Sequence, residues 1–459
     1  MSVPRLVLGG LEPGPAVALA SGALVAAFAG KAVVRPVTIG VDVPLWRLLH
    51  GAGAKAPRAL DARVLGSAVA AELYDDWSAG CDLLALVAVE PALDRWQGAD
   101  GSRAVDVAAA LDAPLVLVVD ARERGVTEAA AVVGIRALAR ATEFAGVIVV
   151  GGDEHGAAEG LRGLIEDRAR LPLLGWIPPQ LSEQFVRQYG SGSAALRQIG
   201  PRPHPGGAVG LCREAASYLR LDELEAVASR RGFVAPRPRK VLAAVPAAAG
   251  LTLAVAWGPP LEPFALENVD LLKAMGLYLA PLHIGRDRAL PPGASGLLLA
   301  GLLDEDALGE FAANVELKTA LAAAVAAGLP TLALGGGAVL LLRRLADSRG
   351  RSHDLAGVVP AEGELLEWYR RPRYVRARAS RENPYDEGEG DVCELFDLEF
   401  LTLQQTAFAY HVGEGNGAGQ AEGFVSGRCL ATTLLPSLPA RPQLASRLVA
   451  AMRPAVSGE

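Results

Sequence analysis

The sequence predicts an α/β fold with two doubly wound domains, each built on a mainly parallel sheet. Short apolar runs alternate with Ala-rich helical stretches, which is typical of parallel strands covered by helices. The chain has 459 residues, more than one hydrophobic core usually holds. A Pro- and Arg-rich segment, Phe233 to Lys240, separates two such alternations. The predicted domains are therefore residues 1–232 and 251–459, joined by a linker over 233–250.

The first domain is expected to begin with a strand and a buried helix within Gly14–Val34. This helix region is rich in Ala, Val, Leu and Gly, but it lacks the cationic start of a signal or membrane segment. The predicted strands are Arg5–Leu8, Val33–Ile39, Asp82–Val89, Pro114–Asp120, Gly146–Val150 and Leu171–Ile177. Further helices are predicted over Val105–Leu111, Thr127–Ala141 and Leu221–Gly232.

The second domain repeats the alternation. Its predicted strands are Leu251–Trp257, Leu277–His283, Gly296–Ala300 and Pro330–Leu334, and its predicted helices are Glu267–Met275, Ala307–Ala327 and Ala338–Ala346. The charged, irregular segment Arg370–Val392 predicts an exposed loop. The last part, Glu422–Met452, is expected to form a strand followed by a helix.

Composition limits the classes of function. The 44 basic and 51 acidic residues give a net charge of −7, so there is no basic excess to neutralise phosphates, and no nucleic acid partner is expected. The four cysteines are far apart without a C-x-x-C pair, which predicts neither a zinc site nor a disulfide framework. The six histidines show no short metal-ligand spacing, so no metal site is expected. The expected location is cytoplasmic, without membrane insertion.

The turn after the first strand is where a nucleotide-binding αβ domain holds phosphates. Such a turn needs backbone N–H groups, a Lys for the β and γ phosphates, and a Ser or Thr hydroxyl for magnesium. Here it contains Gly9, Gly10 and Gly14, with Val17 at the Lys position and Ala18 at the hydroxyl position. Two prolines remove N–H donors, and Glu12 adds negative charge. The turn is therefore predicted to be a packed connection without a nucleotide.

An ordered set of segments resembles the cobyrinate a,c-diamide synthase family from about residue 5 to residue 450. In the first domain, residues 35–42 (RPVTIGVD) resemble P-F-K-x-G-P-D-Y, residues 81–90 (CDLLALVAVE) resemble the strand ending in E-G-x-M-G, residues 102–120 (SRAVDVAAALDAPLVLVVD) resemble S-T-A-D-V-A-x-x-L-x-x-P-V-V-L-V-V-D, and residues 174–178 (LGWIP) resemble L-G-x-x-P. The resemblance places Asp42 and Glu90 where the family acts on its nucleotide and substrate, but each could equally be a solvated or helix-capping carboxylate.

The resemblance continues through the second domain. Residues 298–305 (LLAGLLDE) stand opposite L-x-G-G-Y-P-E, residues 328–337 (GLPTLALGGG) opposite G-x-P-x-x-A-E-C-G-G, and residues 422–435 (EGFVSGRCLATTLL) opposite E-G-F-x-x-G-N-x-L-A-S-Y-x-H. It therefore places the family's nucleophilic cysteine at Gly335 and its catalytic histidine at Leu435. It also implies a P-loop-NTPase-like first domain of the dethiobiotin-synthetase type, and a flavodoxin-like second domain of the class I glutaminase type.

The family amidates the a and c carboxylates of a corrin precursor with ATP and glutamine. Since Gly335 and Leu435 cannot carry a proton, our first hypothesis is a catalytically degenerate member that needs no cofactor and acts as a binding or scaffold subunit. Its expected partner is a second copy or an active relative. One alternative is an active ATP- and Mg-dependent amidoligase that uses ammonia on a tetrapyrrole carboxylate in cobalamin biosynthesis, with Asp42 and Glu90 as residual nucleotide contacts. The other is a non-catalytic carrier of a tetrapyrrole or another small ligand.

Overall fold

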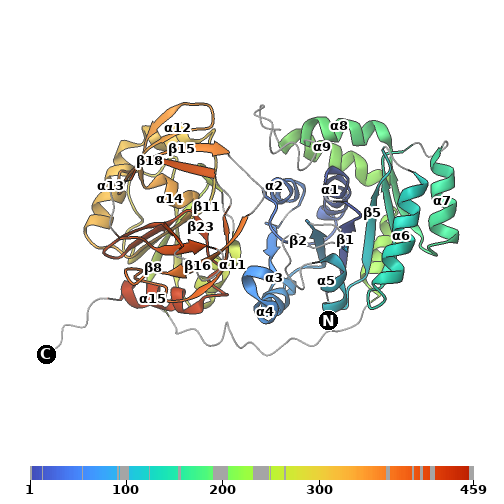
Figure 1. The fold of residues 1–459 in the computed structure, drawn as a ribbon, viewed down its shortest axis with the longest axis horizontal. Helices are drawn as coiled ribbons and strands as arrows, with labels where there is room; N and C mark the ends of the chain where they lie inside the picture. Colours follow the sequence, from blue (N-terminus) through green and yellow to red (C-terminus); the bar gives the residue numbers. More distant parts are fainter. Residues whose placement is uncertain are drawn as a thin grey trace. The chain divides into compact units, whose positions relative to one another are not determined.

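A computed structural model describes most of the chain (Figure 1). The described residues are 3–12, 14–53, 55–89, 92–93, 103–122, 125–152, 157–189, 205–230, 248, 250–262, 265–367, 373–394, 397–403, 407–413 and 419–453. The chain divides into two compact units, Met1–Pro238 and Arg239–Glu459. The predicted linker over 233–250 lies outside the described residues, except for Ala248 and Gly250.

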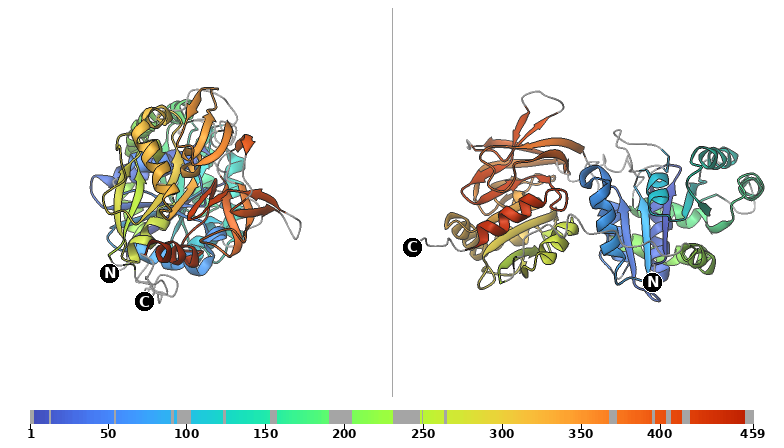
Figure 2. Two further views of the ribbon diagram at one scale, coloured as in Figure 1. Left: turned by 90° about the vertical axis from the view of Figure 1, so that its left-hand side faces the viewer. Right: turned by 90° about the horizontal axis from the view of Figure 1, so that it is seen from below.

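The first unit is built on a parallel sheet with the strand order β3-β2-β4-β1-β5-β6-β7. The strands are β1 (Arg5–Gly10), β2 (Val34–Ile39), β3 (Arg58–Leu60), β4 (Leu83–Ala88), β5 (Leu115–Asp120), β6 (Phe144–Val150) and β7 (Leu173–Ile177). Nearly all of their residues are buried, because helices cover both faces of the sheet (Figure 2). The predicted α/β class and all six predicted strands of this unit are confirmed.

Two hydrophobic cores lie on the two faces of this sheet. One contains side chains of α1 (Pro15–Ala29), α2 (Val43–Ala52), α8 (Pro179–Tyr189), α9 (Pro205–Ala215) and α10 (Leu221–Ala228). The other contains side chains of α3 (Ala62–Leu65), α4 (Ser67–Ser78), α5 (Ala104–Ala110), α6 (Val126–Leu138) and α7 (Ala157–Asp167). The α1 helix is apolar on all sides because it packs against the sheet and against three other helices, as expected for Gly14–Val34.

None of the helices in the described part of the chain is both long and apolar enough to cross a membrane.

The second unit contains a mixed sheet with the order β10-β8-β11-β12-β22-β21, beside which β9 pairs with β11. Its strands are β8 (Thr252–Trp257), β9 (Leu261–Glu262), β10 (Tyr278–His283), β11 (Gly296–Leu303), β12 (Thr331–Gly335), β21 (Phe424–Ser426) and β22 (Cys429–Thr432). The helices are α11 (Leu266–Ala274), α12 (Leu308–Ala313), α13 (Val315–Ala326), α14 (Gly336–Leu340) and α15 (Pro442–Met452). Strands β9 and β21 are antiparallel to their neighbours.

Two further sheets complete the second unit, one mixed and one antiparallel, and the sequence did not predict them. Their orders are β14-β13-β15-β18 and β20-β19-β16-β17-β23. The strands are β13 (Leu342–Ala346), β14 (Ser352–Asp354), β15 (Val359–Glu367), β16 (Arg373–Ala379), β17 (Glu389–Glu394), β18 (Asp397–Leu403), β19 (Tyr410–Gly413), β20 (Gln420–Glu422) and β23 (Leu434–Leu435). Within the first of these sheets, β13 and β15 pair in parallel.

Three predictions for the second domain were wrong, two of them for helices and one for a loop. The predicted helix Ala338–Ala346 ends at Leu340, and the rest forms β13, because β14 and β15 pair with its backbone on both sides. The predicted helix Ala307–Ala327 is divided at Asn314, whose side chain accepts from the Leu317 N–H at 3.2 Å and starts α13.

The predicted exposed loop Arg370–Val392 contains two paired strands, β16 and β17, and a buried turn between them. Asn383, Tyr385 and Asp386 of this turn are buried despite their polarity. Asp386 can be buried because Arg441 pairs with it at 2.5 Å.

Candidate functional site

The described residues between β1 and α1 in the first unit pack closely against side chains of α1 and α5. Val17, at the position predicted for the phosphate-binding lysine, is 4% exposed. A Cβ atom on Gly10 would lie 2.4 Å from Cγ2 of Val17, so the side chain of Val17 packs directly against the backbone of Gly10. Gly9 also lies close to its neighbours, since a Cβ atom there would lie 2.9 Å from Cβ of Ala104. The backbone at Gly9 and Gly10 is therefore closely packed by Ala104 and Val17.

The described residues of this turn do not fit a magnesium–nucleoside triphosphate. Ala18 is buried and offers no hydroxyl, and the first hydroxyl along α1, that of Ser21, donates to the Val17 carbonyl at 2.6 Å. Gly14 lies directly before Pro15, which has no N–H to offer a phosphate. Glu12 is exposed at the tip of the turn. A polyphosphate placed here would meet a carboxylate, not a lysine.

Asp42, predicted as a residual nucleotide contact, caps a helix. Its Oδ1 accepts from the Leu45 N–H at 2.8 Å and thereby starts α2. This contact gives Asp42 a structural role within the first unit. Glu90, predicted with it, lies outside the described residues.

The sequence prediction missed an ion pair at the end of β5. The guanidinium of Arg122 donates to Asp120 from Nε to Oδ1 at 2.8 Å and from Nη2 to Oδ2 at 2.5 Å. A carboxylate that ends a buried strand, followed two residues later by an arginine, was a sequence signal that could have found it.

The second unit preserves the geometry of a nucleophile elbow. Strand β12 ends at Gly335 and α14 begins at Gly336, and Gly335 adopts φ 59° and ψ −124°, a conformation that side chains rarely tolerate. The following glycine pair allows α14 to lie directly on β11, since a Cβ atom on Gly337 would come within 1.9 Å of the Leu299 carbonyl oxygen. The strand–turn–helix expected at Gly335 is therefore present.

The two positions predicted for the catalytic pair face each other. A Cβ atom on Gly335 would lie 2.8 Å from Cδ2 of Leu435, and Leu435 is 6% exposed. The direction in which a nucleophile would project is thus occupied by an isobutyl group. Neither position offers a lone pair or an exchangeable proton, so this pair can neither attack a carbonyl nor accept a proton.

Polar side chains hold the segment around Leu435 firmly in place. Asn268 donates from Nδ2 to the Pro436 carbonyl at 3.2 Å and accepts from the Leu438 N–H at 2.7 Å. Glu422 accepts from the N–H of Thr433 at 2.9 Å and from the hydroxyl of Thr432 at 2.5 Å. The surroundings of the apolar pair are consequently fixed by hydrogen bonds on both sides of Leu435.

None of the described cysteines replaces the missing nucleophile. Cys429 lies in β22 and Cys212 lies in α9, and burial raises the pKa of each thiol to about 12. A thiol with so high a pKa is not a nucleophile at neutral pH. Cys81 is also buried, and desolvation raises its pKa despite the opposing effect of Arg35. The side chain of Cys393 lies outside the described residues.

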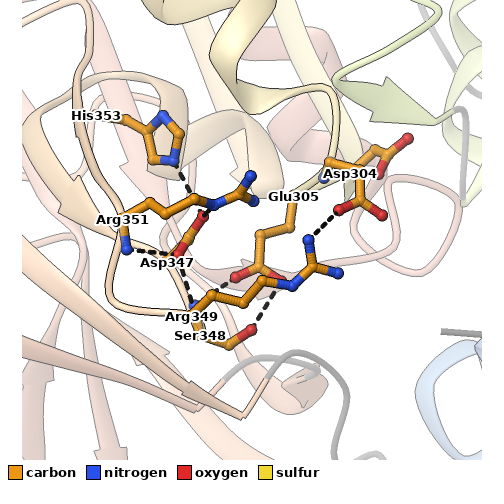
Figure 3. A network of polar contacts seen from close by, with 8 residues as sticks. Asp304, Glu305, Asp347, Ser348, Arg349, Arg351 and His353 are labelled. Atoms are coloured by element: carbon orange, nitrogen blue, oxygen red, sulfur yellow. Dashed lines mark hydrogen bonds and ion pairs between the residues drawn. The ribbon is translucent and has the colours of Figure 1, made fainter. Parts of the chain in front are cut away.

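A second polar network fixes the hairpin between β13 and β14 (Figure 3). Asp347 is buried and accepts from Nε of Arg351 at 2.6 Å, while its Oδ2 also lies 3.1 Å from Nε2 of His353. Burial by itself raises the pKa of Asp347, but the hydrogen bonds from His353 and Arg351 outweigh it, so the pKa lies below the ordinary 3.8. Glu305 accepts from the N–H and hydroxyl of Ser348. The network ties the end of β11 to the hairpin.

Among the described residues, no group of three or more His, Cys, Asp or Glu side chains is arranged to hold a metal ion.

Comparison with known proteins gives relatives along nearly the whole chain. No protein-family model matches. The chain is 25% identical over 474 residues to cobyrinate a,c-diamide synthase of Dehalococcoides mccartyi, covering 98% of both chains. It is 30% identical to the Salmonella typhimurium enzyme of that name, covering 71% of this chain and 70% of the relative. It is 29% identical to hydrogenobyrinate a,c-diamide synthase of Streptomyces coelicolor, covering 75% of this chain and 77% of the relative.

The relatives cover most of the chain, and the Salmonella relative is 30% identical to it. This chain therefore belongs to the cobyrinate a,c-diamide synthase family.

Proposed function

We propose that the chain is a catalytically degenerate member of this family that acts as a binding or scaffold subunit. The observation that carries the proposal is the contact between Gly335 and Leu435, which puts an aliphatic group where the glutaminase reaction needs a thiol and a base. The packing of Val17 against Gly10 supports it independently in the first unit. The proposed partner is a second copy of this chain or an active family member.

The preserved frame also supports a binding role. The elbow, its glycine pair and the hydrogen bonds of Asn268 and Glu422 keep the shape of the site while the reactive groups are absent. If the chain had no remaining role, this frame would be free to change, because the strained backbone at Gly335 and the buried polar side chains each destabilise the fold unless they are compensated. Retention of the frame is expected if the surface it supports still binds a partner.

A second candidate is an amidoligase that uses free ammonia and does not need the glutaminase pair. The observation in its favour is that the identity to the Dehalococcoides synthase extends over 98% of both chains. Its substrate would be the carboxylate of a corrin, as the names of the relatives indicate. It requires ATP to bind without the lysine and the hydroxyl that the turn lacks.

An amidation assay separates the two candidates. The purified chain is incubated with ATP, magnesium, ammonium and either cobyrinate or hydrogenobyrinate, and the corrin is examined by mass spectrometry. The Salmonella relative is the positive control. The scaffold proposal predicts no amidated product with this chain and normal product with the control. ATP-dependent amidation of either corrin would reject the scaffold proposal and establish the ligase.

Co-purification tests the scaffold role directly. The tagged chain is expected to retain an active relative or a second copy of itself, with a fixed stoichiometry in size-exclusion chromatography. A chain that stays monomeric and captures no relative would reject this role. The third hypothesis, a carrier, stays a prediction that a visible-absorbance titration with corrin and porphyrin precursors can test.

A further inference from the structure

Strand β10 forms one edge of the mixed sheet in the second unit. It has six residues, and its partner among the described strands is β8. The strand at the other edge, β21, has only three residues. Tyr278 in β10 is 69% exposed, and Pro281 is also exposed. A strand at an exposed edge presents backbone N–H and C=O groups to which a strand of another molecule can add.

The composition of this edge favours such an addition. Residues 277–284 (LYLAPLHI) contain no aspartate, glutamate, lysine or arginine, and most of them are apolar. Segments of six or seven residues with high β propensity, little charge and no proline readily stack into intermolecular sheets. Charged side chains protect many edge strands, but β10 itself carries none of these four types. Protection of this edge must therefore come from Pro281 or from residues next to the strand.

The pairing with β8 fixes which backbone groups of β10 face outward. The Tyr278 N–H donates to the Leu251 carbonyl at 3.0 Å, so the backbone groups of Tyr278 face β8. Backbone groups of successive residues in a strand point alternately to the two sides. The backbone groups of Leu279, Pro281 and His283 therefore face the edge at which a further strand would add.

Two of these three outward positions are closed. Pro281 has no N–H to donate to an added strand. The His283 N–H donates to Oδ2 of Asp287 at 2.7 Å. The His283 carbonyl accepts from the N–H of Arg286 at 3.1 Å and from that of Asp287 at 2.8 Å. An added strand would thus find a missing donor at one position and engaged groups at the next.

We propose that Pro281 and Asp287 close the edge of β10 and prevent it from pairing with an extended strand, above all with β10 of a second copy of this chain. The proline removes a donor, and the Asp287 carboxylate occupies the next one. This inference concerns open-ended growth of a sheet between copies. It is independent of the proposed scaffold role, whose partner would have to bind through another surface.

The test opens the edge in the full-length chain. Pro281→Thr supplies an N–H in a residue suited to strands, and Asp287→Ala frees the N–H of His283. The double variant is expected to show a several-fold rise in thioflavin T fluorescence and light scattering over time, steeper at higher protein concentration. The wild type is expected to show no rise, and each single variant a smaller rise than the double variant.

Two controls separate the open edge from general loss of stability. Asp287→Asn keeps an oxygen that can accept from His283, so with Pro281 intact it should behave as the wild type does. Asp304→Ala removes a similar contact, because Asp304 accepts from the Asp306 N–H at 3.1 Å. It follows β11, which lies inside the sheet, so its loss should cause no growth. Urea denaturation identifies the variants of similar stability, and Pro281→Thr alone replaces the double variant if the latter does not fold.

Three results would overturn the inference. The first is a folded, stable variant with the edge opened that grows no faster than the wild type. The second is growth of Asp304→Ala equal to that of Asp287→Ala, which would attribute the effect to a lost turn contact. The third is thioflavin-positive growth of the wild type itself. None of these results depends on amidation of a corrin or on capture of a relative, so a failure here is distinguishable from a failure of the proposed function.

Discussion

At the scale of single residues, the contact between Gly335 and Leu435 determines what the elbow of the second unit offers to a ligand. Gly335 lies at the tip of the elbow, and a Cβ atom built on it would lie 2.8 Å from Cδ2 of Leu435. An active pair would need a thiolate at the first position and an imidazole at the second. The leucine occupies the space that a nucleophilic side chain would need, so restoring only one of the two positions would not rebuild the pair.

The contact predicts how Gly335→Ala affects stability. The new methyl group would require φ 59° and ψ −124° of an alanine and would contact Leu435. We expect the free energy of unfolding, measured by urea denaturation, to fall by about 1–3 kcal/mol. Leu435→Ala in the same background should recover part of this loss, because it removes the clash and leaves the backbone strain.

The matched control for this prediction is Gly427→Ala. Gly427 has a similar φ of 55°, but its Cβ position has no heavy atom within 4 Å. Its substitution should cost only the backbone strain, about 1 kcal/mol. If Gly335→Ala costs no more than Gly427→Ala, the contact with Leu435 is not as close as described.

The lowered pKa of Asp347 predicts that the free energy of unfolding decreases at acid pH. Its pKa lies below the ordinary 3.8, because hydrogen bonds from His353 and Arg351 outweigh the effect of burial. The unfolded chain then binds more protons than the folded chain, so the contribution of Asp347 is complete above pH 3.8 and is lost as the pH falls through its lowered pKa.

Asp347→Asn should remove this part of the acid dependence and lower stability at neutral pH. Urea denaturation at a series of pH values measures both effects. Asp222→Asn, which changes an exposed carboxylate on α10, is the control for net charge. An acid limb of the Asp347→Asn profile as steep as that of the wild type would contradict the assignment.

At the scale of helices and strands, regular periodicity was predictable and local cross-strand pairing was not. Most strands of the parallel sheet in the first unit and of the mixed sheet beginning at β10 in the second were predicted, because continuous apolar runs have few other interpretations. The segment Leu342–Ala346 was misassigned because Leu-Arg-Arg-Leu fits both a helix face and a half-buried strand. The turn at Asp386 was misassigned because a run of charges looks exposed, unless its partner at Arg441 is known.

Arg441 contacts several elements of the second unit, so its substitution is expected to lower stability strongly. It precedes α15, pairs with Asp386, and donates to the carbonyls of Ala377 in β16 and Gly390 in β17 at 3.2 and 3.1 Å. Asp386 is fully buried and also accepts from the Tyr410 hydroxyl at 3.3 Å. Arg441→Ala leaves this carboxylate without its cation.

We expect Arg441→Ala to lower the free energy of unfolding by about 3–5 kcal/mol. The control is Arg447→Ala, because Arg447 pairs with Glu387 at 2.5 Å but both side chains are exposed. Its loss should cost about 1 kcal/mol or less. Equal effects of the two substitutions, measured by urea denaturation, would show that burial of the Asp386 pair is not what stabilises this region.

At the scale of the whole molecule, both units are α/β folds, and the predicted site positions Val17, Gly335 and Leu435 carry an aliphatic side chain or none. The order of segments along the sequence was enough to predict the family, and the structure brings Gly335 close to Leu435. The pair of Asp120 and Arg122 was not predicted, although the carboxylate at the end of a buried strand and the arginine two residues later marked it in the sequence. For Asp42 the sequence left a nucleotide contact and a capping or solvated carboxylate open, and the structure shows that it caps α2.

The state of the first unit predicts the response of the intact chain to nucleotide. A ligand that binds only the folded chain stabilises it by about 2.7 kcal/mol at a concentration one hundred times its Kd. We expect millimolar Mg-ATP to leave the melting temperature of the full chain unchanged in differential scanning fluorimetry, with the Salmonella relative as the positive control. A clear upward shift, confirmed by isothermal titration, would contradict the described packing of Val17.

The measurement that tests the central claim most directly is release of glutamate from glutamine by the purified full-length chain. The account predicts release no faster than in buffer, under conditions in which the Salmonella relative hydrolyses glutamine. Sustained glutamate release that a thiol-alkylating reagent abolishes would contradict it, because another cysteine would then be doing what Gly335 and Leu435 cannot.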